Sequence, residues 1–220
     1  MWTSELSGAA ITWAARTTTD AAGAAGGAFM HIPDGFLSTP VSLVLWVVAV
    51  LVVGVALVKV NRDMDEKRVP LMGVMAAAIF AGQMLNFAVT GGTSGHLLGA
   101  AIATALLGPW AAIVVMTCVV GTQAILFQDG GLLALGANLV NMAVIGVAVS
   151  YGVLSVVRRL LGNKRTGWLV GGLLAGWSSI FVASLACALQ LALSGTSPAN
   201  IALPAMGGIH ALIGVGEALI

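Results

Sequence analysis

Charged residues are what this sequence has least of. Asp, Glu, Lys and Arg make up 8% of its 220 residues, whereas 59% of the residues are hydrophobic. Soluble domains carry about 25% charged residues, so a surface that lies mostly in water is excluded. The net charge of +1 gives no indication of nucleic-acid binding, because the nine basic residues are few and grouped in loops.

Cysteines and catalytic signatures are also scarce. Cys118 and Cys187 both lie in apolar runs, and we interpret them as small core residues, not as a disulfide or a metal-binding pair. The sequence has no Gly-x-x-x-x-Gly-Lys-Ser/Thr loop for nucleotides, no His-Glu-x-x-His and no Gly-x-Ser-x-Gly. His210 and Glu217 would lie about 10 Å apart along a helix, too far for a directly paired acid and base. The sequence therefore predicts a protein that is not an enzyme and has no ATPase site of its own.

The sequence contains several long runs of uncharged, mostly apolar residues. Residues 41–58 contain no charge over 18 residues, and at about 1.5 Å per residue they cover roughly 27 Å of a hydrocarbon layer of about 30 Å. Similar runs predict an all-α, polytopic transmembrane bundle of about seven helices, at residues 41–59, 70–89, 95–107, 109–126, 132–157, 168–194 and 204–220. The third helix is short because Gly108 and Pro109 break it before the fourth begins.

The basic residues predict the orientation of the bundle. Eight of the nine lie in two short loops, at residues 59–68 and 158–165, and the positive-inside rule makes both loops cytoplasmic. The N-terminal segment is then outside and the C-terminus cytoplasmic. All three histidines, His31, His96 and His210, fall on the outer side, where their clustering with other polar residues indicates an outward-facing pocket. Asn86 and Ser94 are further candidates to line it.

The first 29 residues differ in composition from the rest. They are rich in Ala, Gly, Thr and Ser and contain no long apolar run, so they do not resemble a secretory signal, which needs a basic start and an apolar stretch. We expect residues 1–29 to be a disordered extension, to be removed, or to precede the true start at Met30. Residues 30–220 are predicted to form the transmembrane metal-binding domain, which ends at Ile220 inside the last predicted helix.

Met30 and His31 together can chelate a transition metal. If Met30 is the free N-terminus, its amine, the backbone nitrogen of His31 and the His31 imidazole supply three nitrogens nearly in a plane. His96, in a glycine-rich stretch that allows a tight turn, would complete a square, and such ligation favours Ni(II) or Cu(II) and accommodates Co(II). The alternatives are an ordinary interhelical turn around His96 and, for His210, either a packing role or the orientation of a ligand.

Seven motifs, in the same order, resemble the substrate-binding membrane components of cobalt and nickel energy-coupling factor transporters, the CbiM/NikM type. They lie at residues 30–38, 83–87, 91–97, 107–110, 127–131, 136–138 and 208–214. The resemblance runs from Met30 to the end of the chain. It implies seven transmembrane helices with the N-terminal segment inserted into the outer face, and a metal held by Met30, His31 and His96. The 29-residue extension departs from this pattern, since it would block the amine of Met30.

The resemblance also implies a function and partners. A protein of this type captures Co(II) or Ni(II) on the outer side of the cell membrane for ATP-driven uptake, with cobalt slightly preferred here, as supply for cobalamin synthesis. Its partners would be a transmembrane coupling subunit, two ATP-binding subunits and a small accessory membrane subunit. No cofactor is expected, because the metal is the transported species. The alternative is a metal-independent membrane channel or solute carrier, which flux without ATPase partners would reveal.

Overall fold

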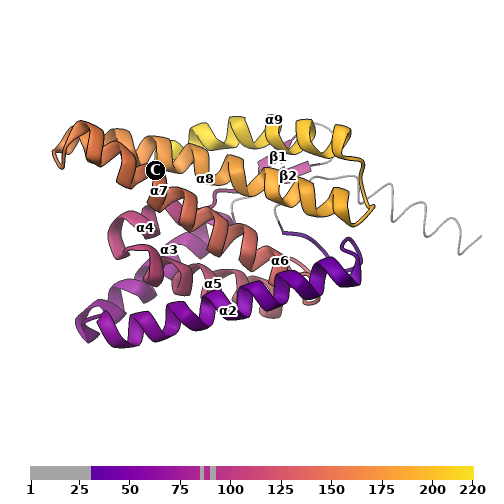
Figure 1. The fold of residues 1–220 in the computed structure, drawn as a ribbon, viewed down its shortest axis with the longest axis horizontal. Coiled ribbons are helices and arrows are strands. Elements are labelled where there is room, and N and C mark those ends of the chain that lie inside the picture. Colours follow the sequence, from indigo (N-terminus) through magenta and orange to yellow (C-terminus); the bar gives the residue numbers. More distant parts are fainter. Residues whose placement is uncertain (1–30, 85–86, 90–92) are drawn as a thin grey trace, which may run out of the picture.

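The computed structural model describes residues 31–84, 87–89 and 93–220, and it is a bundle of helices with one short β-hairpin (Figure 1). The helices are α2 (Thr39–Asp63), α3 (Val69–Gln83), α4 (Ala100–Leu107), α5 (Pro109–Leu126), α6 (Leu135–Leu139), α7 (Gly146–Leu161), α8 (Arg165–Leu193) and α9 (Ala199–Ala218). A 3-10 turn, η1 (Glu66–Arg68), precedes α3, and a π-helical segment, η2 (Val140–Ile145), joins α6 to α7. The predicted all-α polytopic bundle is confirmed.

Five segments are long and apolar enough to cross a membrane, judged by length and composition. They are Thr39–Asp63, Pro109–Leu126, Leu135–Leu161, Arg165–Leu193 and Ala199–Ala218. Helix α2 is the least enclosed of them, and its Leu43, Leu51 and Val58 are each more than 60% exposed. Such large apolar side chains are stable on a surface that contacts lipid. Helices α3 and α4 have only 15 and 8 residues.

Three predicted helices have a wrong end. The helix predicted at 204–220 begins earlier, at Ala199. The helix predicted at 70–89 ends at Gln83, and the one predicted at 95–107 begins only at Ala100. Between them, β1 (Phe87–Val89) and β2 (Thr93–Gly95) pair as antiparallel strands. Gly99 precedes α4 with φ +78°, a left-handed conformation that favours glycine. Residues 96–99 therefore form a loop, which we call the His96 loop.

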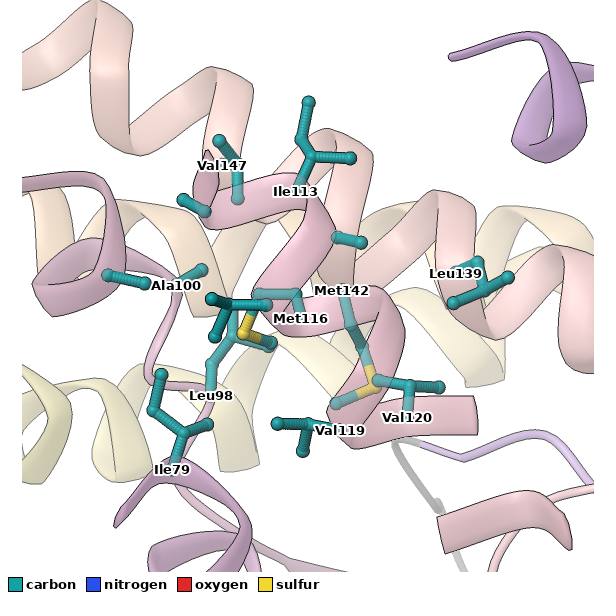
Figure 2. Packing of buried hydrophobic residues seen from close by; sticks show 14 of the residues in the cluster. Ile79, Leu98, Ala100, Ile113, Met116, Val119, Val120, Leu139, Met142 and Val147 are labelled. Atoms are coloured by element: carbon teal, nitrogen blue, oxygen red, sulfur yellow. The ribbon is translucent and has the colours of Figure 1, made fainter. Parts of the chain in front are cut away.

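The apolar core lies where α4, α5 and the α6–η2–α7 segment meet, around Leu98, Met116 and Met142 (Figure 2). Small residues let the helices approach each other closely there. At Gly136 on α6, a Cβ atom would lie 2.6 Å from the Cα of Trp46 on α2. Only glycine fits at this crossing, which holds α6 against α2 and fixes the part of α6 that carries Asn138.

The two basic loops lie at the same end of the bundle. The connection between α2 and α3 and the connection between α7 and α8 are both at the left in Figure 1. Residues 31–38, which we call the N-terminal segment, lead into α2 from the opposite end. The basic loops and the segment that carries His31 are thus separated along the length of the bundle.

Candidate metal site

His31 and His96 lie side by side inside the protein although 65 positions separate them in the sequence. His31 Nδ1 is 3.1 Å from His96 Nε2, and the two rings are stacked with their centroids 4.8 Å apart. Both residues are buried, with 4% and 3% of their surfaces exposed. The fold thus brings together the two imidazoles that the sequence singles out, and their role as metal ligands stays a prediction.

Both imidazoles are neutral at pH 7. Burial lowers the pKa of His31 to about 4, and burial together with the neighbouring His31 lowers the pKa of His96 to about 4. His96 Nδ1 lies 2.8 Å from the carbonyl oxygen of Leu97. Because a carbonyl oxygen only accepts, Nδ1 carries the proton and Nε2 keeps its lone pair. The 3.1 Å contact between Nε2 and His31 Nδ1 is then a hydrogen bond that His31 donates when its Nδ1 carries the proton.

The distance between the two nitrogens suits two ligands of one metal ion. With metal–nitrogen distances of about 2.0–2.1 Å, two nitrogens at a right angle lie about 2.9 Å apart, and two at a tetrahedral angle lie about 3.3 Å apart. The observed 3.1 Å between His31 Nδ1 and His96 Nε2 falls between these values. Nδ1 is also the ring nitrogen that closes a six-membered chelate ring with the backbone nitrogen of the same residue.

Two further polar side chains surround the His31 ring. Asp129 Oδ1 lies 3.6 Å from His31 Nδ1, and its side chain is 33% exposed. Gln123, on α5, is fully buried and interacts with His31, yet neither of its amide atoms, nor His31 Nε2, has a hydrogen-bond partner of ordinary geometry among the described residues. A small rotation of Gln123 would let its Oε1 accept the Nε2 proton, which would keep the lone pair on Nδ1.

The described side chains alone do not complete a metal site. Within residues 31–84, 87–89 and 93–220, no group of three or more His, Cys, Asp or Glu residues is placed to hold a metal ion. Among these residue types, His31 and His96 place two ring nitrogens 3.1 Å apart, and their part in metal binding stays a prediction.

Asn138 on α6 holds the N-terminal segment next to His31. The Ile32 N–H donates to Asn138 Oδ1 at 2.8 Å, and Asn138 Nδ2 donates to the Ile32 carbonyl at 3.1 Å. The same carbonyl accepts a hydrogen bond from the Gly131 N–H. The Ile32 side chain is buried among residues of α6, α8 and α9. Both backbone polar groups of Ile32 are thus satisfied inside the protein, which fixes the residue that follows His31.

Asp34 fastens the N-terminal segment to the loop before α6. Its Oδ1 accepts from the N–H groups of Leu133 and Ala134 at 2.8 and 3.0 Å, and its Oδ2 accepts from the Leu132 N–H at 3.1 Å. The chains approach so closely here that a Cβ atom at Gly131 would lie 2.0 Å from Asp34 Oδ1. This contact requires glycine and explains the motif at residues 127–131.

The other predicted site residues have different positions. Met30 and Asn86 lie outside the described residues, so their roles stay predictions. Ser94 lies in β2, opposite Ala88 of β1. His210 on α9 is fully buried, with Nδ1 2.8 Å from the Met206 carbonyl and with Nε2 lacking a partner among the described residues. A positive charge on His210 would repel a positive charge on His96, and this repulsion contributes to the lowered pKa of His96.

The sequence assigned no contact partners to four polar residues that lie near the two histidines or bind the segments that carry them. They are Gln123, Asp129, Asn138 and Glu217. Asp129 and Asn138 belong to the glycine-containing motifs at 127–131 and 136–138, which could have identified them as residues of a closely packed loop. Gln123 and Glu217 are polar residues within apolar helices, a type that usually faces a cavity or a polar partner.

Fold and site together define an integral membrane protein with a buried pair of neutral imidazoles. The family described as "Cobalt uptake substrate-specific transmembrane region", CbiM, matches residues 31–220. The chain belongs to this family, as the motifs predicted. The family is a metal transport component and not a family of enzymes, so the chain is a metal transport protein.

Two relatives and one solved structure show how far the similarity extends. A metal transport protein of Haloquadratum walsbyi is 39% identical over 193 residues, which cover 87% of this chain and 86% of that protein. The fused nickel transport protein NikMN of Rhodobacter capsulatus is 35% identical over 199 residues, covering 84% of this chain but 57% of the longer fused protein. A crystal structure of a truncated transition metal transporter is 37% identical, with a TM-score of 0.78 over 86% of this chain and 93% of that one.

Proposed function

We propose that this protein captures Co(II) or Ni(II) on the outer side of the cell membrane and delivers it for ATP-driven uptake by an energy-coupling factor transporter. The observation that carries the proposal is the 3.1 Å separation of His31 Nδ1 and His96 Nε2, both buried and both in neutral rings. Neutral imidazole is a preferred ligand of these metals. A channel or a metal-independent carrier has no need of two buried imidazole nitrogens 3.1 Å apart.

The remaining ligands in this proposal come from the start of the metal-binding domain. A free Met30 amine and the His31 backbone nitrogen would add two donors to His31 Nδ1, giving two fused chelate rings with His96 Nε2 in the fourth position. The orientation of His31 supports this set, because Nδ1 is the nitrogen that such a chelate uses. The proposal requires a free Met30 amine, so residues 1–29 must be absent from the mature protein. The mass of the N-terminal peptide from isolated membranes would show whether Met30 is the first residue.

The ends of the bundle support the proposed orientation. The basic loops share one end and the N-terminal segment lies at the other. With the positive-inside rule, this arrangement supports a metal site on the outer side and a cytoplasmic C-terminus. The sequence contains no phosphate-binding loop, so ATP hydrolysis would be supplied by two ATP-binding subunits. A transmembrane coupling subunit and a small accessory membrane subunit would complete the transporter.

We propose a slight preference for cobalt, and competition between the two metals tests it. The family description names cobalt uptake, whereas the fused relative from Rhodobacter capsulatus is named for nickel. Both metals accept the same nitrogen ligands, so selectivity depends on geometry more than on ligand type. Titration of Co(II)-loaded protein with Ni(II) measures the ratio of the two affinities directly. A ratio that favours Ni(II) would reverse the proposed preference.

Calorimetric titration of the purified protein beginning at Met30 tests metal capture. We expect binding of Co(II) and Ni(II) to the wild type, loss of binding in His31→Ala, and weakened but measurable binding in His96→Ala. The matched control is the same chain with its Met30 amine acetylated, which keeps both imidazoles and removes one proposed ligand. Unchanged binding in His31→Ala would refute the proposal. Metal-independent solute flux through the isolated chain in vesicles would favour the alternative, a channel or carrier.

A further inference from the structure

The His96 loop is fixed by side chains from two helices that are distant in the sequence. Glu217, on α9, accepts two hydrogen bonds of 2.7 Å, from Leu98 N–H to Oε2 and from Gly99 N–H to Oε1. Gln83, the last residue of α3, donates from Nε2 to the Leu98 carbonyl at 2.6 Å. Both polar groups of the Leu98 backbone are therefore held by buried side chains, two positions after His96.

The Glu217 carboxylate suits the place where it lies. Helix α4 begins at Ala100, directly after the two N–H groups that Glu217 binds. The first N–H groups of a helix lack partners within the helix, and the helix dipole favours a negative charge there. A carboxylate buried in an apolar helix needs such donors to be stable. None of the described Lys or Arg side chains forms an ion pair with it, so backbone N–H groups carry this role.

We propose that Glu217 is a positioning residue for the metal site, which fixes the His96 loop so that His96 Nε2 faces His31 Nδ1. The proposal rests on the proposed function, since it assigns His96 to the metal. Gly99 supports it, because its left-handed backbone and its close approach to Ile79, where a Cβ atom would lie 2.8 Å from that side chain, leave the loop little room to move. With the chain fixed at Leu98 and Gly99, the His96 ring has one backbone position from which to reach His31.

Glu217→Gln is the most informative variant, because it keeps the length of the side chain and changes only one of the two hydrogen-bond acceptors. Glutamine offers one oxygen for one of the two N–H groups and turns an NH₂ group toward the other, so the loop is released at one point. We expect a 10- to 100-fold loss of Co(II) affinity, the range typical of residues that orient a metal ligand. In a His96→Ala background, the same change should weaken binding less than about threefold, because the residue through which Glu217 acts is already missing.

Trp177→Phe is the matched control. Trp177 Nε1 donates to the Ala211 carbonyl and so joins α8 to α9 by a hydrogen bond that does not involve the His96 loop. This variant should lower the thermal stability of the bundle and leave Co(II) affinity within about twofold of the wild type. If Glu217→Gln weakens binding equally with and without His96, or if Trp177→Phe reproduces its effect, Glu217 only stabilises the fold and the proposal is wrong.

Hydrogen exchange of the metal-free protein separates this proposal from the proposed function. In Glu217→Gln, peptides that include Leu98 and Gly99 should exchange faster than in the wild type, while peptides from α5 should not change. Unchanged exchange at these two positions would overturn the positioning role whatever the metal result. Failure of the wild type to bind Co(II), with faster exchange in the variant, would instead refute the proposed function and leave the contact between Glu217 and the loop intact.

Discussion

Asn138 offers the most direct test of how the fold positions His31. Its amide makes two hydrogen bonds with the Ile32 backbone, and it is fully buried. Asn138→Ala leaves the Ile32 N–H without its acceptor, whereas the Ile32 carbonyl keeps its bond from Gly131. A buried N–H that loses its partner costs about 1–3 kcal/mol. If the N-terminal segment detaches so that the Ile32 N–H can bind water, the segment must return to its place before the metal binds. The same free energy is then lost from metal binding, and the dissociation constant rises roughly 5- to 150-fold.

Asn141 provides a control of the same residue type on the next turn. It is also fully buried, and its amide makes two hydrogen bonds, with the amide of Gln190 on α8 at 2.8 and 2.6 Å. Asn141→Ala should therefore lower stability by a similar amount without releasing the N-terminal segment. Competition with a chromophoric chelator measures Co(II) affinity in both variants, and thermal unfolding in detergent measures stability.

The two variants should separate clearly. We expect both to melt at a lower temperature and only Asn138→Ala to lose metal affinity beyond about twofold. Equal affinities for Asn138→Ala and the wild type would show that the N-terminal segment keeps its position without this contact. Equal losses in the two variants would show that metal affinity follows the stability of the whole bundle, and that the amide of Asn138 has no particular role in placing His31.

Two substitutions and two measurements of pH dependence test the site further. Gly131→Ala should destabilise the protein and weaken metal binding, because its Cβ would lie 2.0 Å from Asp34 Oδ1 and 2.3 Å from the Asp34 nitrogen. Thermal unfolding measures the loss of stability. Gly121→Ala is the control, since a Cβ atom there meets nothing within 4 Å. Asp34→Asn should cost about 1–3 kcal/mol of stability, because an amide oxygen and an NH₂ group replace a carboxylate that accepts three N–H bonds. The pH dependence of Co(II) affinity should show whether Met30 binds the metal together with the two imidazoles. With the pKa of His31 and His96 lowered to about 4, protons compete for the imidazoles only near that pH, whereas a free amine has a pKa of about 8. Affinity should then fall about a hundredfold per pH unit from pH 7 to 5 if the Met30 amine and the His31 backbone nitrogen both bind, because each gives up one proton. It should fall about tenfold per unit if only the amine binds, and stay flat if only the imidazoles bind. The folded protein without metal should lose stability as the pH falls from 6.5 toward 4, because the unfolded chain then binds more protons.

The long helices could be predicted from the sequence because the bilayer imposes their length. Uncharged runs and the break at Gly108 and Pro109 gave α2, α5 and α8 to within a few residues. The ends of α3 and α4 could not be found in this way. The glycine-rich stretch at residues 90–95 marks a turn, but it does not show that α3 ends as early as Gln83 or that α4 begins as late as Ala100. Those two ends depend on tertiary contacts. Backbone contacts of Leu98 with Gln83 and Glu217, together with the left-handed Gly99, replace the helical hydrogen bonds.

The site was partly predictable for a similar reason. His31 and His96 could be singled out because imidazole is rare in this chain and has specific chemistry, with three histidines in all. The residues that position them could not, since an amide or a carboxylate in a helix does not show which backbone group it will meet. Asn138 meets Ile32 across 106 positions, and Glu217 meets Leu98 across 119. Contacts at such separations depend on how the helices pack against each other. A local sequence pattern does not predict that packing.

The same long-range contacts explain why two loops can hold a well-defined pair of imidazoles. Each histidine lies in a segment without helical hydrogen bonds of its own, and each neighbouring backbone is tied to a buried side chain instead. The N-terminal segment is tied to Asn138 on α6, whereas the His96 loop is tied to Glu217 on α9. The separation of His31 Nδ1 and His96 Nε2 therefore depends on the position of α6 relative to α9 and to α3, whose Gln83 also binds the His96 loop. A change in that packing alters the distance between the two nitrogens even when neither histidine is touched. If the two histidines bind the metal as proposed, such a change alters metal affinity although both ligands are still present.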